Sequence, residues 1–256
     1  TAGLDVLLWP TLIHTHNEEI ELVKSARQGQ KCRIVAAPAS FDTLSCKGGF
    51  LAQPDQMLVW GEASKRHALA WHGMAEPTVA VTGPGHFDFY HEERQMTGDP
   101  AILVAGSSVH YWKDELEFVA FLRHHIYRLI HRPHPRRGGG WTWGAMEELR
   151  SQLDRAVCVV AAFSTVVIEA ALMDKPSFLV GFGQSTHGPA GADYHAQLEH
   201  MAEVASWPGV FLCRSKEELL EALLRTDWDR PGLRRRALEV ARSDGHAQER
   251  ILEALE

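Results

Sequence analysis

The sequence predicts an α/β fold built on a Rossmann-like, doubly wound parallel sheet. Short apolar, β-branched runs recur along all 256 residues, with segments of helical periodicity between them. The runs are continuous rather than alternating, as expected for strands that are buried on both faces. Strands that alternate with helices form a parallel sheet covered by helices, and such sheets bind ligands at the carboxyl ends of their strands.

The individual elements follow from these patterns. Nine apolar runs are predicted as strands: Val6–Leu8, Arg33–Ala36, Met57–Trp60, Thr78–Val81, Ala101–Ala105, Arg128–His131, Val157–Ala161, Ser177–Gly181 and Val210–Cys213. Six segments between them have helical patterns: Glu62–His72, Asp114–His125, Met146–Leu153, Val166–Met173, Tyr194–Ala205 and Glu217–Arg225. Ser215 and Glu218 have the S-x-x-E spacing of a capping box, which predicts a helix start. The tail from Pro231 predicts two helices with a break near residues 243–245.

Two domains are expected, with a boundary in the polar stretch Glu92–Pro100. Residues 1–95 contain a strand–helix series that is too short for a complete Rossmann-like domain. Residues 96–256 are long enough for one, and we assign the C-terminal helices to this second domain.

Composition narrows the functional class. Hydrophobic residues make up 45% of the chain and charged residues 23%, which is typical of soluble proteins. A formal net charge of −7 argues against a dedicated nucleic-acid-binding protein. The longest apolar run, Ala156–Phe163, is far below the roughly 18–20 residues that span a bilayer. No signal peptide is visible, and the predicted location is the cytoplasm.

Cysteine and histidine spacing predicts no metal site and no disulfide. The four cysteines lie far apart in the sequence and form no C-x-x-C pair, so we expect buried thiols in a reducing compartment. The fifteen histidines include no H-E-x-x-H or Cys/His ligand spacing. The basic cluster Arg123–Arg137 could touch anionic lipid, but a solvated face or a phosphate-facing loop is the preferred interpretation.

The segment His131–Pro135, with the sequence HRPHP, follows a predicted strand of the second domain. Arg132 and His134 could pair there with a nucleotide phosphate, and the prolines would fix the backbone that carries them. The alternative is a rigid strand exit that is basic by chance. On its own, the segment leaves both interpretations open.

A second candidate follows the next strand, where Ser164 and Thr165 precede a predicted helix. Either hydroxyl could cap the helix, whose free N–H groups favour an anion, and Glu169 could bind a ribose diol. The alternative is a plain helix cap with Glu169 merely solvated. The functional interpretation gains support because this loop and the HRPHP loop are expected at the same sheet edge.

Two weaker candidates complete the set. Ser107 and Ser108 follow Gly106 at the end of a predicted strand, where small residues allow the backbone to approach a phosphate. In the loop Ser40–Gly49, Asp42 could act as a general base and Lys47 could offset phosphate charge. Spacing alone favours a surface loop with an incidental ion pair.

Taken in order, these segments resemble the GT-B superfamily of nucleotide-sugar transferases and non-hydrolysing UDP-GlcNAc 2-epimerases. The resemblance is carried by residues 40–48, the VWGE sequence of 59–62, the VTGPGHFD sequence of 81–88, the RPHP sequence of 132–135 and the STVVIEAALMDKP sequence of 164–176. It is closer to bacterial capsule and wall enzymes: CDP-glycerol glycerophosphotransferase-like proteins, polysialyltransferases and Kdo transferases. It implies a GT-B fold with an incomplete N-terminal domain on the acceptor side.

The resemblance also implies an activity. The second domain would bind the nucleotide through His134, Ser164, Thr165 and Glu169, and no metal or cofactor would be needed. Asp42 stands where the glycerophosphotransferases have a catalytic histidine, and Lys47 matches their lysine. This difference favours transfer of a sugar from a CMP- or UDP-linked donor to a saccharide or lipid-linked acceptor of a surface polysaccharide.

Several alternatives remain open. They are a polyol-phosphate transferase that uses CDP-glycerol, a non-catalytic nucleotide-binding module and, less favoured, a 2-epimerase. The lipid-linked acceptor is compatible with work at the inner face of the membrane. A peripheral contact with the membrane or with a partner subunit is an expectation of the same kind.

Overall fold

A computed structural model describes residues 5–10, 17–29, 32–50, 52–91, 98–107, 112–135, 142–162, 164–184, 197–225 and 227–256. The chain folds into two compact units. One comprises the residues up to His91 together with Leu238–Glu256, and the other comprises Glu92–Ala237. Each unit is described by itself.

The second unit contains a parallel sheet of five strands among its described residues. These strands are β5 (Ala101–Ala105), β6 (Leu129–Arg132), β7 (Ala156–Ala161), β8 (Ser177–Val180) and β9 (Val210–Cys213). Their order in the sheet is β6-β5-β7-β8-β9. The chain therefore runs from β5 to one side, returns across β5, and continues on the other side.

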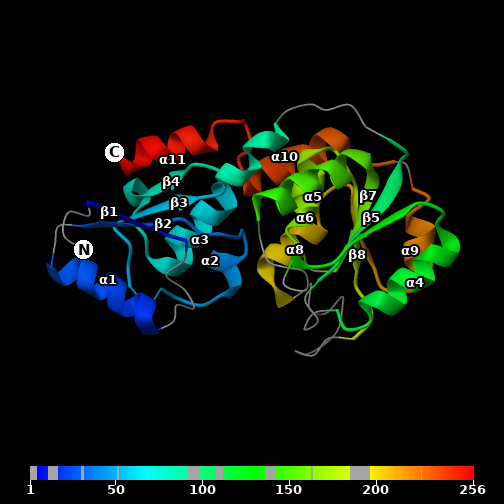
Figure 1. Cartoon of the computed structure of the whole chain (residues 1–256), viewed down its shortest axis with the longest axis horizontal. Helices are drawn as coiled ribbons and strands as arrows, with labels where there is room; N and C mark the ends of the chain where they lie inside the picture. Colours follow the sequence, from blue (N-terminus) through cyan, green and yellow to red (C-terminus); the bar gives the residue numbers. More distant parts are fainter. Residues whose placement is uncertain are drawn as a thin grey trace. The chain divides into compact units, whose positions relative to one another are not determined.

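Helices cover both faces of this sheet (Figure 1). One face carries α4 (Glu115–His125) and α9 (Lys216–Ala222), whose Phe118, Leu122 and Leu219 pack against alternate strand residues such as Val104 and Val160. The other face carries α5 (Trp143–Arg155), α6 (Val166–Leu172) and α8 (Glu199–Ala205). Burial on both faces explains the continuous apolar runs in the sequence.

The first unit has a four-stranded parallel sheet among its described residues. Its strands, β1 (Val6–Trp9), β2 (Arg33–Ala36), β3 (Gln56–Val59) and β4 (Val79–Val81), lie in sequence order. The connections include α1 (Asn17–Gly29), α2 (Thr43–Cys46) and α3 (Glu62–His72). Because parallel crossovers are right-handed, successive connections in this order place their helices on one face. Residues of all three helices share a core with that face, through Val23, Leu44 and Ala68.

The C-terminal helix packs with the first unit, which corrects the assignment of all C-terminal helices to the second domain. Helix α10 (Arg230–Val240) crosses the boundary between the units, and α11 (Ala247–Leu255) follows it. The short helix η2 (Gly85–Tyr90) holds the start of α11 through Asp88, whose two carboxylate oxygens each accept a backbone N–H, from Ala247 and Gln248, at 2.9 Å.

Arg33 of β2 holds the other end of α11 by donating to the carbonyls of Ala254 and Leu255. The carboxylate thus lies at the positive end of the helix dipole and the guanidinium at the negative end. The physical reason for this placement is the sequential strand order, which leaves the second face of the sheet without crossover helices. Val35 and Leu58 alternate with the core residues of the first face and are also buried.

All nine predicted strands are present, with ends that differ by at most one residue. The predicted helix start at Ser215 is confirmed, because its hydroxyl accepts the N–H of Glu218 at 3.1 Å. The helices α1 and α2 and the helix η2 are present without having been predicted. Among the described residues, no helix is both long and apolar enough to span a membrane.

Candidate functional site

The strand order of the second unit defines where its sheet can bind a ligand. Connections leave β5 and β7 toward opposite sides, so a topological switch point lies between these two strands. In open parallel sheets, ligands bind in the crevice outside the carboxyl ends of the strands at such a point. The candidate site is therefore the carboxyl edge of β5 and β7, with β6 beside them.

The register of the strands aligns the loops that carry the predicted site residues. Ala105 of β5 pairs with Arg132 of β6 on one side and with Ala161 of β7 on the other. Ser107, His134 and Ser164 follow these three residues by two or three positions. The loops therefore leave the same edge of the sheet, and the ends of β6 and β7 lie about 10 Å apart across β5. One nucleotide is long enough to contact both.

Ser107 lies at the end of β5 and is fully buried. Its hydroxyl oxygen has no hydrogen-bond partner in the part of the chain that the structure describes. A buried polar group of this kind is uncommon and costs folding free energy unless a ligand or water satisfies it. Ser108, the other predicted residue of this turn, lies outside the described residues.

A buried carboxylate fixes the turn that carries Ser107. Glu115, the first residue of α4, is 0% exposed, and its Oε2 accepts the backbone N–H of Ser107 at 3.0 Å. Its Oε1 lies 2.9 Å from Nε2 of His131 on β6. Gly106 permits this approach, because a Cβ atom at that position would overlap the carboxylate. Glu115 thus joins the carboxyl ends of β5 and β6.

The residues just before Glu115 join the same segment to the end of β8. Asp114 Oδ2 accepts the backbone N–H of Gln184 at 2.9 Å, and Lys113 donates its N–H to the carbonyl of Gln184 at 2.9 Å. The start of α4 is therefore held by the turn after β5, by β6 itself and by the loop after β8.

Arg132 has a structural role that the sequence pattern does not indicate. Its Nη2 donates to the carbonyl of Ala145 at 2.6 Å, and its Nη1 donates to Gln152 Oε1 at 3.3 Å. The same nitrogen lies 3.4 Å from the carboxylate of Glu148. These three partners belong to α5, so the guanidinium ties β6 to that helix. A guanidinium has five N–H donors, more than these contacts use.

His134 and the loop after β7 flank the two sides of the edge. His134 is half-buried and follows Pro133, the first residue after β6. Ser164 caps α6, since its hydroxyl accepts the N–H of Val166 at 3.3 Å, whereas Thr165 makes no side-chain cap. Both residues are half-buried. The expected capping role therefore belongs to Ser164.

Glu169 does not have the solvated side chain that the alternative interpretation assumed. All residues of α6 are buried, and Glu169 is only 8% exposed. A simply solvated glutamate is therefore excluded at this position. A buried carboxylate costs free energy unless it has partners, so its role is internal or ligand-directed.

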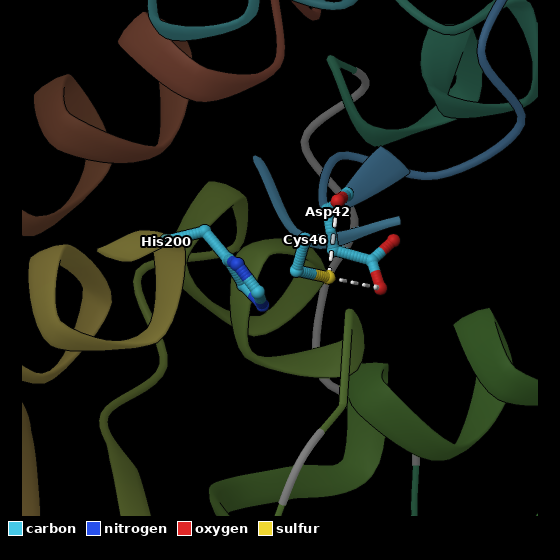
Figure 2. A group of neighbouring side chains, drawn as sticks. All are labelled: Asp42, Cys46 and His200. Carbon is cyan, nitrogen blue, oxygen red and sulfur yellow. Dashed lines mark hydrogen bonds between the residues drawn. The ribbon is translucent and has the colours of Figure 1, made fainter. Parts of the chain in front are cut away.

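In the first unit, Asp42 and Lys47 form the ion pair that their spacing suggested. Lys47 Nζ lies 3.0 Å from Asp42 Oδ1, with 39% and 24% of the two side chains exposed. The two residues flank α2, and Figure 2 shows Asp42 and Cys46 on this turn. The Cys46 thiol lies 3.3 Å from the carbonyl and 3.8 Å from Oδ2 of Asp42.

Cys46 corrects one expectation, because it is exposed while the other three cysteines are buried. All four are free. Partial desolvation raises the pKa of the Cys46 thiol to about 11, and the negative charge of Asp42 acts in the same direction. The thiol is therefore protonated near neutral pH and is a poor nucleophile.

Sequence reasoning missed Glu115 and did not select His131, although it lies in the HRPHP segment. An acidic residue at the start of a helix is common because it interacts favourably with the helix dipole. The spacing of eight residues to Ser107 and sixteen to His131 carries no recognisable pattern. The signal is the three-dimensional meeting of the loops.

The two units with parallel sheets form a fold of the GT-B type. No protein-family model matches the chain, and no curated protein matches it in sequence. The similarity is to solved structures, and it concerns the fold.

Three solved structures illustrate this similarity. The UDP-GlcNAc 2-epimerase of Methanocaldococcus jannaschii, in complex with UDP-GlcNAc and UDP, is 14% identical with a TM-score of 0.54, and the match covers 98% of this chain and 74% of that one. A candidate UDP-N-acetylglucosamine 2-epimerase from Listeria monocytogenes is 15% identical with a TM-score of 0.58, and the match covers 98% and 73%. A variant of the wall teichoic acid polymerase TagF with CDPG is 12% identical with a TM-score of 0.54, and the match covers 88% and 67%.

Proposed function

We propose that the chain is a glycosyltransferase that moves a sugar from a CMP- or UDP-linked donor to a saccharide or lipid-linked acceptor of a surface polysaccharide. The observation that carries this proposal is the switch point between β5 and β7, where the buried Ser107 hydroxyl has no partner among the described residues. A ligand with phosphate oxygens or sugar hydroxyls would satisfy it.

The proposed donor site uses the loops that leave this edge. Ser107 and Ser108 contact the phosphates from the end of β5. His134 and Arg132 offset phosphate charge from the β6 side. On the β7 side, Ser164 and Thr165 contact the phosphate and Glu169 the ribose. Fixed donors that face a developing negative charge stabilise the leaving nucleotide, CMP or UDP, without reorganisation.

The proposed catalytic pair lies in the first unit. Asp42 is the general base for the acceptor hydroxyl, and Lys47 offsets negative charge beside it. Their 3.0 Å ion pair places a cation next to the carboxylate, an arrangement that fits the catalytic role and also a purely structural pair. The resemblance to GT-B transferases implies that no metal or cofactor takes part.

The compared structures support donor binding at a coarse level. The M. jannaschii protein is in complex with UDP-GlcNAc and UDP, and the TagF variant is with CDPG. Similarity to the TagF variant also favours a second candidate, a polyol-phosphate transferase that uses CDP-glycerol. The two activities break different bonds, because the first transfers the sugar from its anomeric carbon and the second transfers a phosphoglyceryl group. With either donor, we propose that the reaction takes place in the cytoplasm, at the inner face of the membrane.

A ligand screen followed by turnover assays tests the proposal. CMP, CDP, UDP and their sugars are added in a thermal-shift screen, since a ligand that binds the native state at 100 times its Kd adds about 2.7 kcal/mol to stability. Donors that stabilise the protein are then incubated with saccharide and lipid-linked acceptors, and the free nucleotide released is measured.

The outcomes separate the candidates. Release of UDP or CMP together with a glycosylated acceptor supports the glycosyltransferase. The polyol-phosphate transferase is supported if CDP-glycerol is the one donor that reacts, with release of CMP and transfer of the phosphoglyceryl group to the acceptor. Conversion of UDP-GlcNAc to its 2-epimer without acceptor identifies an epimerase. Stabilisation without turnover of any donor identifies a binding module, and the absence of stabilisation by every nucleotide refutes a nucleotide site.

A further inference from the structure

The pair formed by Glu115 and His131 lies beside the proposed donor site and has no role in the function derived above. Glu115 begins α4 on one face of the second sheet, and His131 precedes the last residue of β6. Their side chains approach to 2.9 Å between Oε1 and Nε2. The carboxylate side chain is 0% exposed and the imidazole side chain is 12% exposed.

Hydrogen-bond chemistry sets the proton position in this pair. Oε2 of Glu115 already accepts a bond from a backbone N–H, which can only donate. A carboxylate can only accept hydrogen bonds, so the hydrogen between Oε1 and Nε2 belongs to the ring. Nε2 of His131 therefore carries the hydrogen and donates to Oε1. In the neutral ring, Nδ1 is then an acceptor.

The second ring nitrogen is open. Within the described residues, Nδ1 of His131 has no hydrogen-bond partner, and 12% of the side chain is exposed. His131 is the residue before the carboxyl end of β6 and lies opposite Val104 in the register. The turn with the buried Ser107 hydroxyl is held by the same carboxylate. One buried carboxylate thus fixes a buried hydroxyl and an imidazole nitrogen that both have no partner among the described residues.

We propose that Glu115 is a positioning residue that holds His131 in the Nε2–H tautomer, so that Nδ1 accepts a hydrogen bond from a hydroxyl group of the bound nucleotide. The hydrogen bond from the nucleotide to Nδ1 rests on the proposed donor site, whereas the tautomer of His131 does not. A hydroxyl on the ribose or on the transferred sugar has the required donor. Recognition of that donor would add selectivity for hydroxyl-bearing ligands, because a fixed acceptor left unpaired disfavours ligands that lack one.

Nitrogen NMR of histidine-labelled protein tests the tautomer directly. Two-bond proton–nitrogen correlations distinguish protonated from unprotonated ring nitrogens, and loss of one signal set in His131→Gln or His131→Asn identifies the residue. Above neutral pH, we expect Nε2 protonated and Nδ1 unprotonated. This test uses the wild-type protein, in which Glu115 is unaltered. A proton on Nδ1, or exchange between the two tautomers, would overturn the inference.

The variant Glu115→Gln provides a functional test. A glutamine side chain can still accept the Ser107 N–H and can donate its amide hydrogen to Nε2, which transfers the ring proton to Nδ1. The packing is retained, but the acceptor is lost. We expect the inverted tautomer in the NMR spectrum and about tenfold weaker UDP or CDP binding by calorimetry. The matched control is Glu117→Gln, an exposed glutamate of the same helix, which should retain wild-type affinity.

The tautomer of His131 and its role in ligand binding are tested separately. If UDP and CDP bind and Nδ1 does not shift on binding, or if Glu115→Gln inverts the tautomer with unchanged affinity, the ligand role of His131 is refuted while the donor site stands. If neither nucleotide binds the wild-type chain, the proposed function and the ligand role both fall, and the tautomer result remains a property of the fold.

Discussion

Ser107 has a fully buried hydroxyl without a partner among the described residues, and groups of this kind lower the stability of a folded protein. Most buried polar groups have a partner, so an exception requires an explanation. A ligand that reaches the end of β5 would provide one. The unpaired hydroxyl therefore lowers the stability of the folded chain but would contribute to the affinity for a ligand.

The variant Ser107→Ala tests this conflict. Removal of the hydroxyl should leave the free energy of unfolding unchanged or raise it by up to about 1 kcal/mol, because an unsatisfied buried group is eliminated. Nucleotide affinity should fall by about 0.5–1.5 kcal/mol, the usual value of one hydrogen bond. Urea unfolding and calorimetry measure the two quantities. A loss of stability without a loss of affinity would show that the hydroxyl serves the fold.

The buried imidazole of His86 predicts how the stability of the chain depends on pH. It lies in η2 against Trp60 and Phe87, with ring centroids 5.3 and 4.6 Å away. Burial lowers its pKa from 6.5 to about 4, and the charge of Asp88 opposes this shift only in part. Between these two values, the unfolded chain binds a proton that the folded chain does not.

Stability should therefore fall as the pH is lowered from about 6.5 to 4, by about 3 kcal/mol in total, and should be independent of this group above 6.5. Urea unfolding at pH 7.5 and at pH 4.5 measures the loss. In His86→Gln, which has no ring to protonate, the difference between the two pH values should shrink. Equal pH dependence in both proteins would contradict a buried neutral imidazole.

At the level of single residues, sequence reasoning identified the hydroxyls and basic residues of the candidate site but missed the carboxylate of Glu115. Ser107, His134 and Ser164 are recognisable because each follows a predicted strand. Glu115 acts through bonds to residues eight and sixteen positions away, and nothing in its local sequence distinguishes it from an ordinary first-turn glutamate. Arg132 illustrates the converse, because its basic character suggested a phosphate although its guanidinium binds α5.

At the level of elements, α11 is held to the first unit by hydrogen bonds at both ends. Asp88 accepts the first free N–H groups of the helix, and Arg33 donates to its last carbonyls. The Ser243 hydroxyl adds a buried bond to the carbonyl of Phe87 at 2.9 Å. Asp88 is 159 residues before Ala247 in the chain, so this cap is a tertiary contact.

Asp88→Ala should lower the free energy of unfolding by about 1–2 kcal/mol, because two helix N–H groups lose their acceptor. Asp88→Asn is the matched control, since an amide oxygen retains one acceptor, and it should lose less. Urea unfolding followed by circular dichroism measures both variants. An unchanged free energy in Asp88→Ala would mean that α11 does not depend on this cap.

Strands were easier to predict than the packing of helices. Strands such as β2, β3, β5 and β8 are buried along most of their length and appear as continuous apolar runs. Helix α2 has only four residues and leaves almost no periodic signal. The two C-terminal helices were predicted, but their location was not. The location of α11 depends on which face of the first sheet lacks crossover helices, and this is a property of the strand order.

At the level of the whole molecule, the two units differ in what their topology can offer. The first sheet runs in sequence order and has no switch point among its described strands, whereas the second has one between β5 and β7. A ligand crevice is therefore expected in the second unit. The proposed catalytic pair, Asp42 and Lys47, belongs to the first unit.

The location of a bound nucleotide tests the central claim most directly. Crystals of the chain grown with UDP, and separately with CDP, would show where the diphosphate binds. We predict density at the carboxyl ends of β5 and β7, with a phosphate or sugar oxygen within hydrogen-bond distance of the Ser107 hydroxyl and beside Ser164. A nucleotide bound elsewhere, with that hydroxyl still unpaired, would contradict the account.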